Sequence, residues 1–206
     1  MTSDVYDAMF SAQPRSGLFH GVVVGLVTNV KDPDKLDRVR VKLPWLPDAP
    51  ETDWARVAVP MAGNGWGMSL PLELNAEVLV AFEHGNPAVP YVIGVLWNGK
   101  DKPPATNDDG KSDVRQIRTR SGHVVRFTDQ DGGEKIEIID KTTKNSIVFD
   151  SAKNALTITA DTDITIEAKS GKLKLSGQSV EIAAKTTAKV EGSCGLTLKG
   201  ATVNIN

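Results

Sequence analysis

Pairs of apolar residues, each interrupted by one polar residue, recur from Leu156 to the end of the chain. The first members of successive pairs lie 7 to 9 residues apart. An apolar, polar, apolar triplet is typical of a strand that buries one face. A repeat this short holds only one very short strand and a bend, so it predicts a solenoid or β-helix in which each unit needs stacked neighbours. The pairs are Leu156/Ile158, Ile164/Ile166, Leu173/Leu175, Val180/Ile182, Ala188/Val190, Leu196/Leu198 and Val203/Ile205.

A change in composition near Pro104 predicts two modules. All eleven prolines, all four tryptophans and both tyrosines lie at or before Pro104, and no aromatic residue follows Phe149. The polar, proline-containing stretch after residue 99 is typical of a linker. We therefore expect four parts, which are an N-terminal segment at 1–18, a compact domain at 19–99, a linker at 100–113 and a repetitive stalk at 114–206.

The overall composition argues against several classes of protein. A formal net charge of −2 over 206 residues gives no excess of positive charge to attract nucleic acid or a membrane surface. The single cysteine, Cys194, excludes an internal disulfide framework. No apolar run approaches the roughly 18 residues that span a bilayer, and residues 1–17 lack the apolar core of a signal peptide. We expect a chain that is made in the cytoplasm.

The compact domain at 19–99 contains short β-branched and alternating apolar runs with turn signals between them. Gly63-Asn-Gly65 and His84-Gly-Asn-Pro87 are two of these turn signals. Five short strands without a helical stripe between them predict an all-β domain, a five-stranded OB-fold barrel. The expected strands are 22–30, 38–43, 54–59, 77–82 and 91–96.

An OB barrel often binds nucleic acid or oligosaccharide, so that function is the alternative. Its four tryptophans, Trp45, Trp54, Trp66 and Trp97, are suited to stacking on bases. However, the domain is slightly acidic, and its arginines alternate with valine near Asp or Glu. We expect the tryptophans to wedge the ends of the barrel or to make subunit contacts.

Seven ordered segments resemble the spike family of contractile injection systems. That family includes phage baseplate assembly protein V, the tail-spike OB domains of contractile phages and the VgrG proteins of type VI secretion. The stretch IRTRSGHVVRF at 117–127 looks like the start of the family's β-helix. The seven segments are DRVRVKLPW at 37–45, WARV at 54–57, AGNGWGM at 62–68, EVLVAF at 77–82, GNP at 85–87, PYVIGVLWNG at 90–99 and KPP at 102–104.

The resemblance implies a homotrimer whose C-terminal parts intertwine into a triangular β-prism. It implies a hub protein at the N-terminal end, contacted by residues 1–18, and a small PAAR-repeat protein at the tip. The long hub domain of VgrG does not precede this OB barrel, which favours the short spike of a phage tail or tail-like particle. The expected location is therefore the tail baseplate of a virion or of a released particle, with transient contact with the target membrane and no nucleic acid partner.

The apolar repeat favours the same trimer independently of the resemblance. One stack of octads leaves its apolar face in water, whereas three copies around an axis bury it and pair every strand. For the blunt C-terminal end we expect a cap that contacts Val203, Ile205 and Asn206. The residues expected in the trimer core are Ile136, Ile138, Ile147, Phe149, Leu156, Ile158, Ile164, Ile166, Leu173, Leu175, Val180, Ile182, Leu196 and Leu198.

The sequence offers no arrangement suited to catalysis or metal binding. His20, His84 and His123 fall in separate expected elements, without a His-x-His or HExxH pair, and we expect His123 to make a structural hydrogen bond. Gly132-Gly133 is not followed by the helix of a phosphate-binding loop, and no serine has the setting of a hydrolase nucleophile. We expect no catalytic residue, no metal site, no cofactor and no enzymatic activity, with a hidden lysozyme-like activity as the competing hypothesis.

Overall fold

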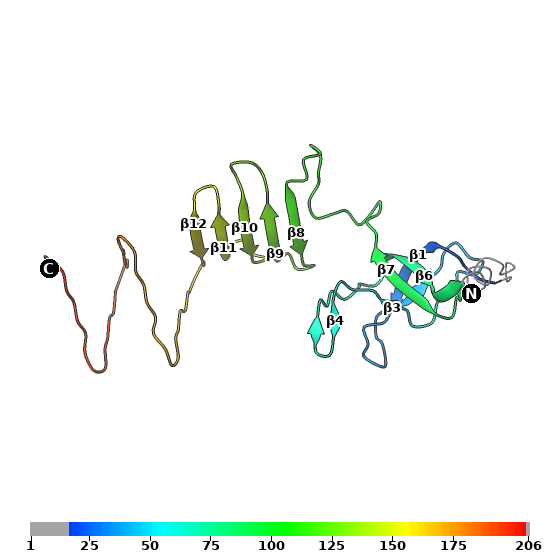
Figure 1. The fold of residues 1–206 in the computed structure, drawn as a ribbon, viewed down its shortest axis with the longest axis horizontal. Helices are drawn as coiled ribbons and strands as arrows, with labels where there is room; N and C mark the ends of the chain where they lie inside the picture. The colour runs from blue at the N-terminus through cyan, green and yellow to red at the C-terminus, as the bar shows by residue number, and fades with distance from the viewer. Residues whose placement is uncertain (1–16, 205–206) are drawn as a thin grey trace, which may run out of the picture.

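A computed structural model describes residues 17–204 of the chain. The predicted hub-contacting segment lies outside the described residues except for 17–18, and so do Ile205 and Asn206 of the predicted tip contact. The described part is all-β, with twelve strands and a single 3₁₀ turn at Glu83–Gly85. Two β modules and an extended C-terminal tail follow one another along an elongated molecule (Figure 1). No helix within residues 17–204 is long and apolar enough to cross a membrane.

The first module is a five-stranded sheet in the order β2-β1-β6-β7-β3, and we call it the head. β3 is parallel to β7, and the other neighbours are antiparallel. Isolated bridges from Val39 to Ala55 and from Lys42 to Glu51 link β2 to the segment that leads into β3, which closes an OB-like ring. All five strands predicted for the head are present. They are β1 (Val22–Asn29), β2 (Arg40–Lys42), β3 (Arg56–Val57), β6 (Glu77–Phe82) and β7 (Pro90–Val95).

Alternating valines form the core of the head. In β6 the burial alternates along the strand, so that Val78, Val80 and Phe82 face inward. Gly25 lets β1 and β2 approach closely, because a Cβ atom at this position would lie 2.3 Å from Cγ1 of Val41. The largest fully buried side chains are Val27, Val41, Val78, Val80 and Val92.

The loop between β1 and β2 is organised around the carboxylate of Asp32. Its side chain is only 2% exposed and accepts hydrogen bonds from Nε of Arg38 at 3.0 Å and from the amide of Leu36 at 2.9 Å. The hydrogen bonds from the Arg38 side chain are the main cause that holds the pKa of Asp32 far below its ordinary range. The ion pair therefore fixes the start of β2 relative to the end of β1.

A small hairpin projects from the head toward the second module (Figure 1). It consists of β4 (Ala62–Gly63) and β5 (Trp66–Gly67). The indole of Trp66 lies directly over Gly63, where a Cβ atom would come within 2.2 Å of the ring. The turn predicted at residues 63–65 is therefore confirmed, but the two short strands that flank it were not predicted.

The second module is an antiparallel meander of five strands, and we call it the wall. Each strand pairs with the next one along the chain, in the order β12-β11-β10-β9-β8. Tight turns join them, and Gly122, Gly132, Thr143 and Asn154 all have positive φ in these turns. The strands are β8 (Val114–Arg118), β9 (Val124–Thr128), β10 (Lys135–Ile139), β11 (Ser146–Asp150) and β12 (Ala155–Thr159).

The tail, residues 160–204, is an extended zigzag whose limbs do not pair with one another as the strands of the wall do (Figure 1). Backbone bends begin at residues 161, 169, 177, 185, 193 and 201, a spacing of eight residues. The first apolar residue of each predicted pair lies two positions after the last residue of the bend. The bend at 169–171 is one residue longer than the bends at 161–162 and 177–178, which accounts for the nine-residue spacing from Ile164 to Leu173. The repeat seen in the sequence therefore has a regular backbone counterpart.

A test of the loop follows from the Asp32 carboxylate. Since its pKa is lower in the folded than in the unfolded state, where it is about 4, the charged group stabilises the fold above pH 4. This contribution is lost as the pH falls toward the folded-state value. We expect Asp32→Asn to lower the denaturation midpoint at pH 7, and the difference from the wild type to shrink below pH 4. Tryptophan fluorescence measures this, because all four tryptophans lie at or before Trp97.

The matched control is Asp34→Asn, which also removes a carboxylate that contacts Arg38 but whose side chain is 65% exposed. It should have a small effect at every pH, because exposed ion pairs contribute little. An Asp32→Asn effect of the same size at pH 7 and pH 3 would contradict this role of the carboxylate.

Candidate functional site

One face of the wall carries two rows of apolar side chains. Residues directly opposite each other on antiparallel strands lie on the same face, so the strand register defines the rows. Of the ten positions on this face, only Arg115, opposite Phe127, is polar. The first row is Phe127, Ile136, Phe149 and Leu156, and the second row is Ile117, Val125, Ile138, Ile147 and Ile158.

These two rows are not the core of a single chain. Seven of the nine side chains, from Ile136 at 39% to Leu156 at 57%, remain largely exposed. The second row lines a shallow groove of about 370 Å³, which is flanked by His123 and Asn145. Exposed apolar surface of this extent marks an interaction site. The wall is therefore built to be covered by another polypeptide or by another copy of itself.

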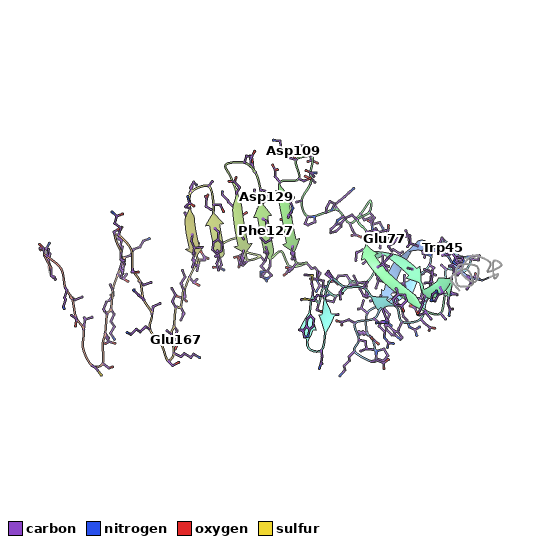
Figure 2. All side chains as sticks on the ribbon, in the orientation of Figure 1. Trp45, Glu77, Asp109, Phe127, Asp129 and Glu167 are labelled. Carbon is purple, nitrogen blue, oxygen red and sulfur yellow. The ribbon has the colours of Figure 1, made fainter. Side chains whose placement is uncertain are left out.

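The opposite face of the wall is mostly polar, apart from positions such as Val124 and Ile139, and it carries its own cross-strand contacts. Arg126 donates from Nε to Oε1 of Gln116 at 3.1 Å, and it forms an ion pair with Glu137 at 3.5 Å. These residues face each other across three neighbouring strands. The wall is therefore an amphipathic sheet with one face suited to water and one face suited to burial. Figure 2 marks Phe127 and Asp129, which lie at and just after the end of β9.

The tail continues the exposed apolar pattern without any cover. From Ile164 to Val203, its large apolar side chains are between 52% and 77% exposed. Every described residue from Asp161 onward is exposed, and none lies in a hydrogen-bonded strand. Extended backbone with unpaired amides and apolar side chains in water is unfavourable for a chain on its own. The tail, like the wall, therefore needs partners.

The structure places the fourteen residues of the predicted trimer core in two groups. Ile136, Ile138, Ile147, Phe149, Leu156 and Ile158 share the apolar face of the wall, and the other eight lie in the limbs of the tail.

Sequence reasoning missed Ile117, Val125 and Phe127 as members of the apolar face. The spacing of Val125 and Phe127 shows the same apolar, polar, apolar pattern as the repeat, and this signal could have identified them. Val203 is described and 52% exposed, whereas its predicted tip-contacting neighbours lie outside the described residues.

The arginines and tryptophans of the head differ in their surroundings. Arg40 lies over the ring of Trp54 at 5.1 Å and pairs with Glu51 at 3.0 Å, and Arg38 pairs with Asp32. Trp45 packs edge-on against Phe19 at 5.3 Å, as expected for a wedge at the barrel end. Trp66 and Trp97 remain exposed. Two of the arginines are therefore occupied by carboxylates, which does not favour a basic groove for nucleic acid.

The ring of His20 lies beside Gly85, the residue after His84, whereas His123 directly precedes β9 of the wall. Nδ1 of His123 accepts a hydrogen bond from the amide of Lys141 at 3.2 Å, which is the structural role expected for it. Within residues 17–204, no three His, Cys, Asp or Glu side chains come together in a way that could hold a metal ion.

Arg120 joins the wall to the head. Its guanidinium contacts both carboxylate oxygens of Glu73, at 2.9 and 2.8 Å, across 47 residues of sequence. Arg120 lies in the turn between β8 and β9, and Glu73 precedes β6. The contact is exposed, so it orients the two modules more than it stabilises them.

Comparison with known proteins identifies the head. Residues 23–97 match the family described as the type VI secretion system/phage-baseplate injector OB domain. This match covers all five strands of the ring except the first residue of β1. It confirms the resemblance that the seven sequence segments indicate.

Three curated relatives match about half of the chain. The chain is 31% identical over 112 residues to the type VI secretion system spike protein VgrG3 of Vibrio cholerae, which covers 50% of the chain and 11% of that protein. It is 28% identical over 131 residues to the type VI secretion system spike protein VgrG1a of Pseudomonas aeruginosa, which covers 58% of the chain and 20% of that protein. It is 29% identical over 111 residues to the actin cross-linking toxin VgrG1 of Vibrio cholerae, which covers 50% of the chain and 10% of that protein.

The aligned region thus spans only about a tenth to a fifth of the length of these relatives. The family match itself is confined to the OB domain at residues 23–97, which is similar to the OB domain of type VI secretion and phage-baseplate injectors.

Proposed function

We propose that this chain is the central spike of a contractile phage tail or phage-tail-like injection particle. Three copies form a rod that lies under the tail tube and hub and punctures the envelope of the target cell mechanically. The observation that carries the proposal is the tail at 160–204, an extended chain with a regular apolar repeat and no partner of its own. Such a segment has a purpose only inside an assembly of several chains.

Three chains satisfy the geometry better than two. The strands of the wall follow one another along the long axis of the molecule, so its edge strands β8 and β12 face the linker and the tail (Figure 1). Three walls around this axis would bury their apolar rows against one another, as the faces of a triangular prism do. In the tail, the limbs of one chain do not lie next to each other, so limbs of two other chains fit between them (Figure 1). The homotrimer implied by the resemblance therefore agrees with the arrangement of the limbs.

The assembled rod would be stiff and hydrated. Each Leu, Ile or Val that becomes fully buried contributes roughly 1.5–3 kcal/mol, and the contribution repeats along the whole stalk. The residue between the two apolar members of each pair, such as Lys174, Glu181 or Lys189, would point outward into water. A rod of this kind passes through a bilayer under force without inserting into it, because its exterior has no apolar belt.

The two ends of the rod would contact different partners. The head and the segment at 1–18 would dock on the baseplate hub, and the C-terminal end at 203–206 would carry a PAAR-repeat tip protein. The role is mechanical, with no catalytic step and no cofactor. The chain would be made in the cytoplasm, built into the baseplate of a virion or tail-like particle, and released with it.

Amide hydrogen exchange tests the assembly of the tail. In a lone chain, the unpaired amides of residues 161–204 would exchange as fast as those of an unstructured peptide. In the trimer, these amides pair with limbs of the other chains, so we expect exchange that is about a hundredfold or more slower. The exposed turn residues Asp108 and Asp109 of the linker serve as an internal fast-exchanging control. Full exchange of the tail within the dead time would contradict the proposal.

A truncation tests the tip contact. Ending the chain after Gly195 removes the last two apolar pairs, and we expect loss of binding to a purified PAAR-repeat protein in a pull-down, with the head still folded. The control is Thr197→Ala in the full chain, which changes an outward position between Leu196 and Leu198 and should bind normally. Equal binding by the truncated chain would rule out the C-terminal end as the tip site.

A further inference from the structure

The wall and the tail differ in where their hydrogen bonds lie. All five strands of the wall pair within one chain, and each neighbouring pair has a continuous register of five residues. The described part of the tail has no such pairs. A wall can therefore form its backbone hydrogen bonds before it meets a partner, whereas a tail cannot.

The tail also specifies its register weakly. Its bends begin every eight residues, and each apolar pair from Ile164 onward starts at the same position after a bend. If one chain slides by one octad relative to the other two, apolar pairs again meet apolar pairs over most of the length. Repeats with this property are prone to slippage, because neighbouring registers bury nearly the same surface.

The wall, in contrast, has a pattern that does not repeat. One row places Phe127 and Phe149 on either side of Ile136, and the other row contains only Ile and Val. The wall also begins at the linker and has a fixed number of strands. Three such faces complement one another at a single relative height, since sliding them would leave aromatic side chains exposed at one end.

We propose that the apolar face of the wall docks on the same face of two further copies, and that this contact sets the register in which the tails intertwine. The proposal rests on the trimer proposed above and assigns different roles to the two parts of the stalk. The wall associates first, because its contacts are between neighbouring strands and its loops are short. The tails then start from aligned ends after β12 and wind together in only one register.

One substitution at three positions tests the division of roles. Ile147→Lys places a charge on the apolar face of the wall, and Val148→Lys places the same charge one residue later on the polar face, opposite Glu137. Ile182→Lys places it in a limb of the tail. We expect native mass spectrometry to give single chains for Ile147→Lys and trimers for Val148→Lys and Ile182→Lys. Hydrogen exchange should show that Ile182→Lys loses protection only around its own limb.

Pulse-labelled hydrogen exchange during refolding of the wild type gives a second readout, which does not depend on whether Ile147→Lys folds. Amides of β9 to β11 should gain protection before amides at 173–198, and the protection of the tail should depend on chain concentration. Trimers of Ile147→Lys, single chains of Ile182→Lys, or protection of the tail before the wall would each overturn the register-setting role while leaving the trimer itself intact. A wild-type protein that is a single chain would overturn the proposed function.

Discussion

The stalk depends on apolar side chains that a single copy of the chain cannot bury. The wall exposes two rows of Ile, Val, Leu and Phe, and the tail exposes further pairs at each octad up to Val203. Within residues 17–204 the single chain covers neither set, since the side chains of both remain exposed and the limbs of the tail do not pair with one another. The proposed association with identical copies would satisfy the side chains and the unpaired backbone together, and it would leave the polar residues of the stalk on its outside.

The head follows a different principle. Its valine core closes within one chain, and the carboxylate of Asp32 fixes the loop between β1 and β2 through its hydrogen bonds with Arg38 and Leu36. The head is thus a stable platform to which the stalk is attached by the linker and by the contact from Arg120 to Glu73. A folded head at one end and an assembling stalk at the other suit a part that connects a baseplate to a tip.

Much of this architecture could be predicted from the sequence because its periodicity is local. The strand over residues 77–82 has the predicted bounds, and the tail bends where the apolar repeat requires. The strand expected at 54–59 is shorter in the structure, since only Arg56 and Val57 pair with β7. The β4–β5 hairpin was missed, because two-residue strands leave no periodic signal and depend on Trp66 packing over Gly63. The sequence also did not predict that the strands of the wall pair within one chain. The same alternation of apolar and polar residues is equally suited to strands that pair between chains.

The number of chains in the particle is the most direct test of the proposed trimer. Light scattering coupled to size-exclusion chromatography gives the molar mass in dilute buffer without reference to shape. We expect a mass about three times the 22.1 kDa of one chain, unchanged on dilution. A mass equal to that of one chain, with the apolar face of the wall and the tail open to water, would contradict it.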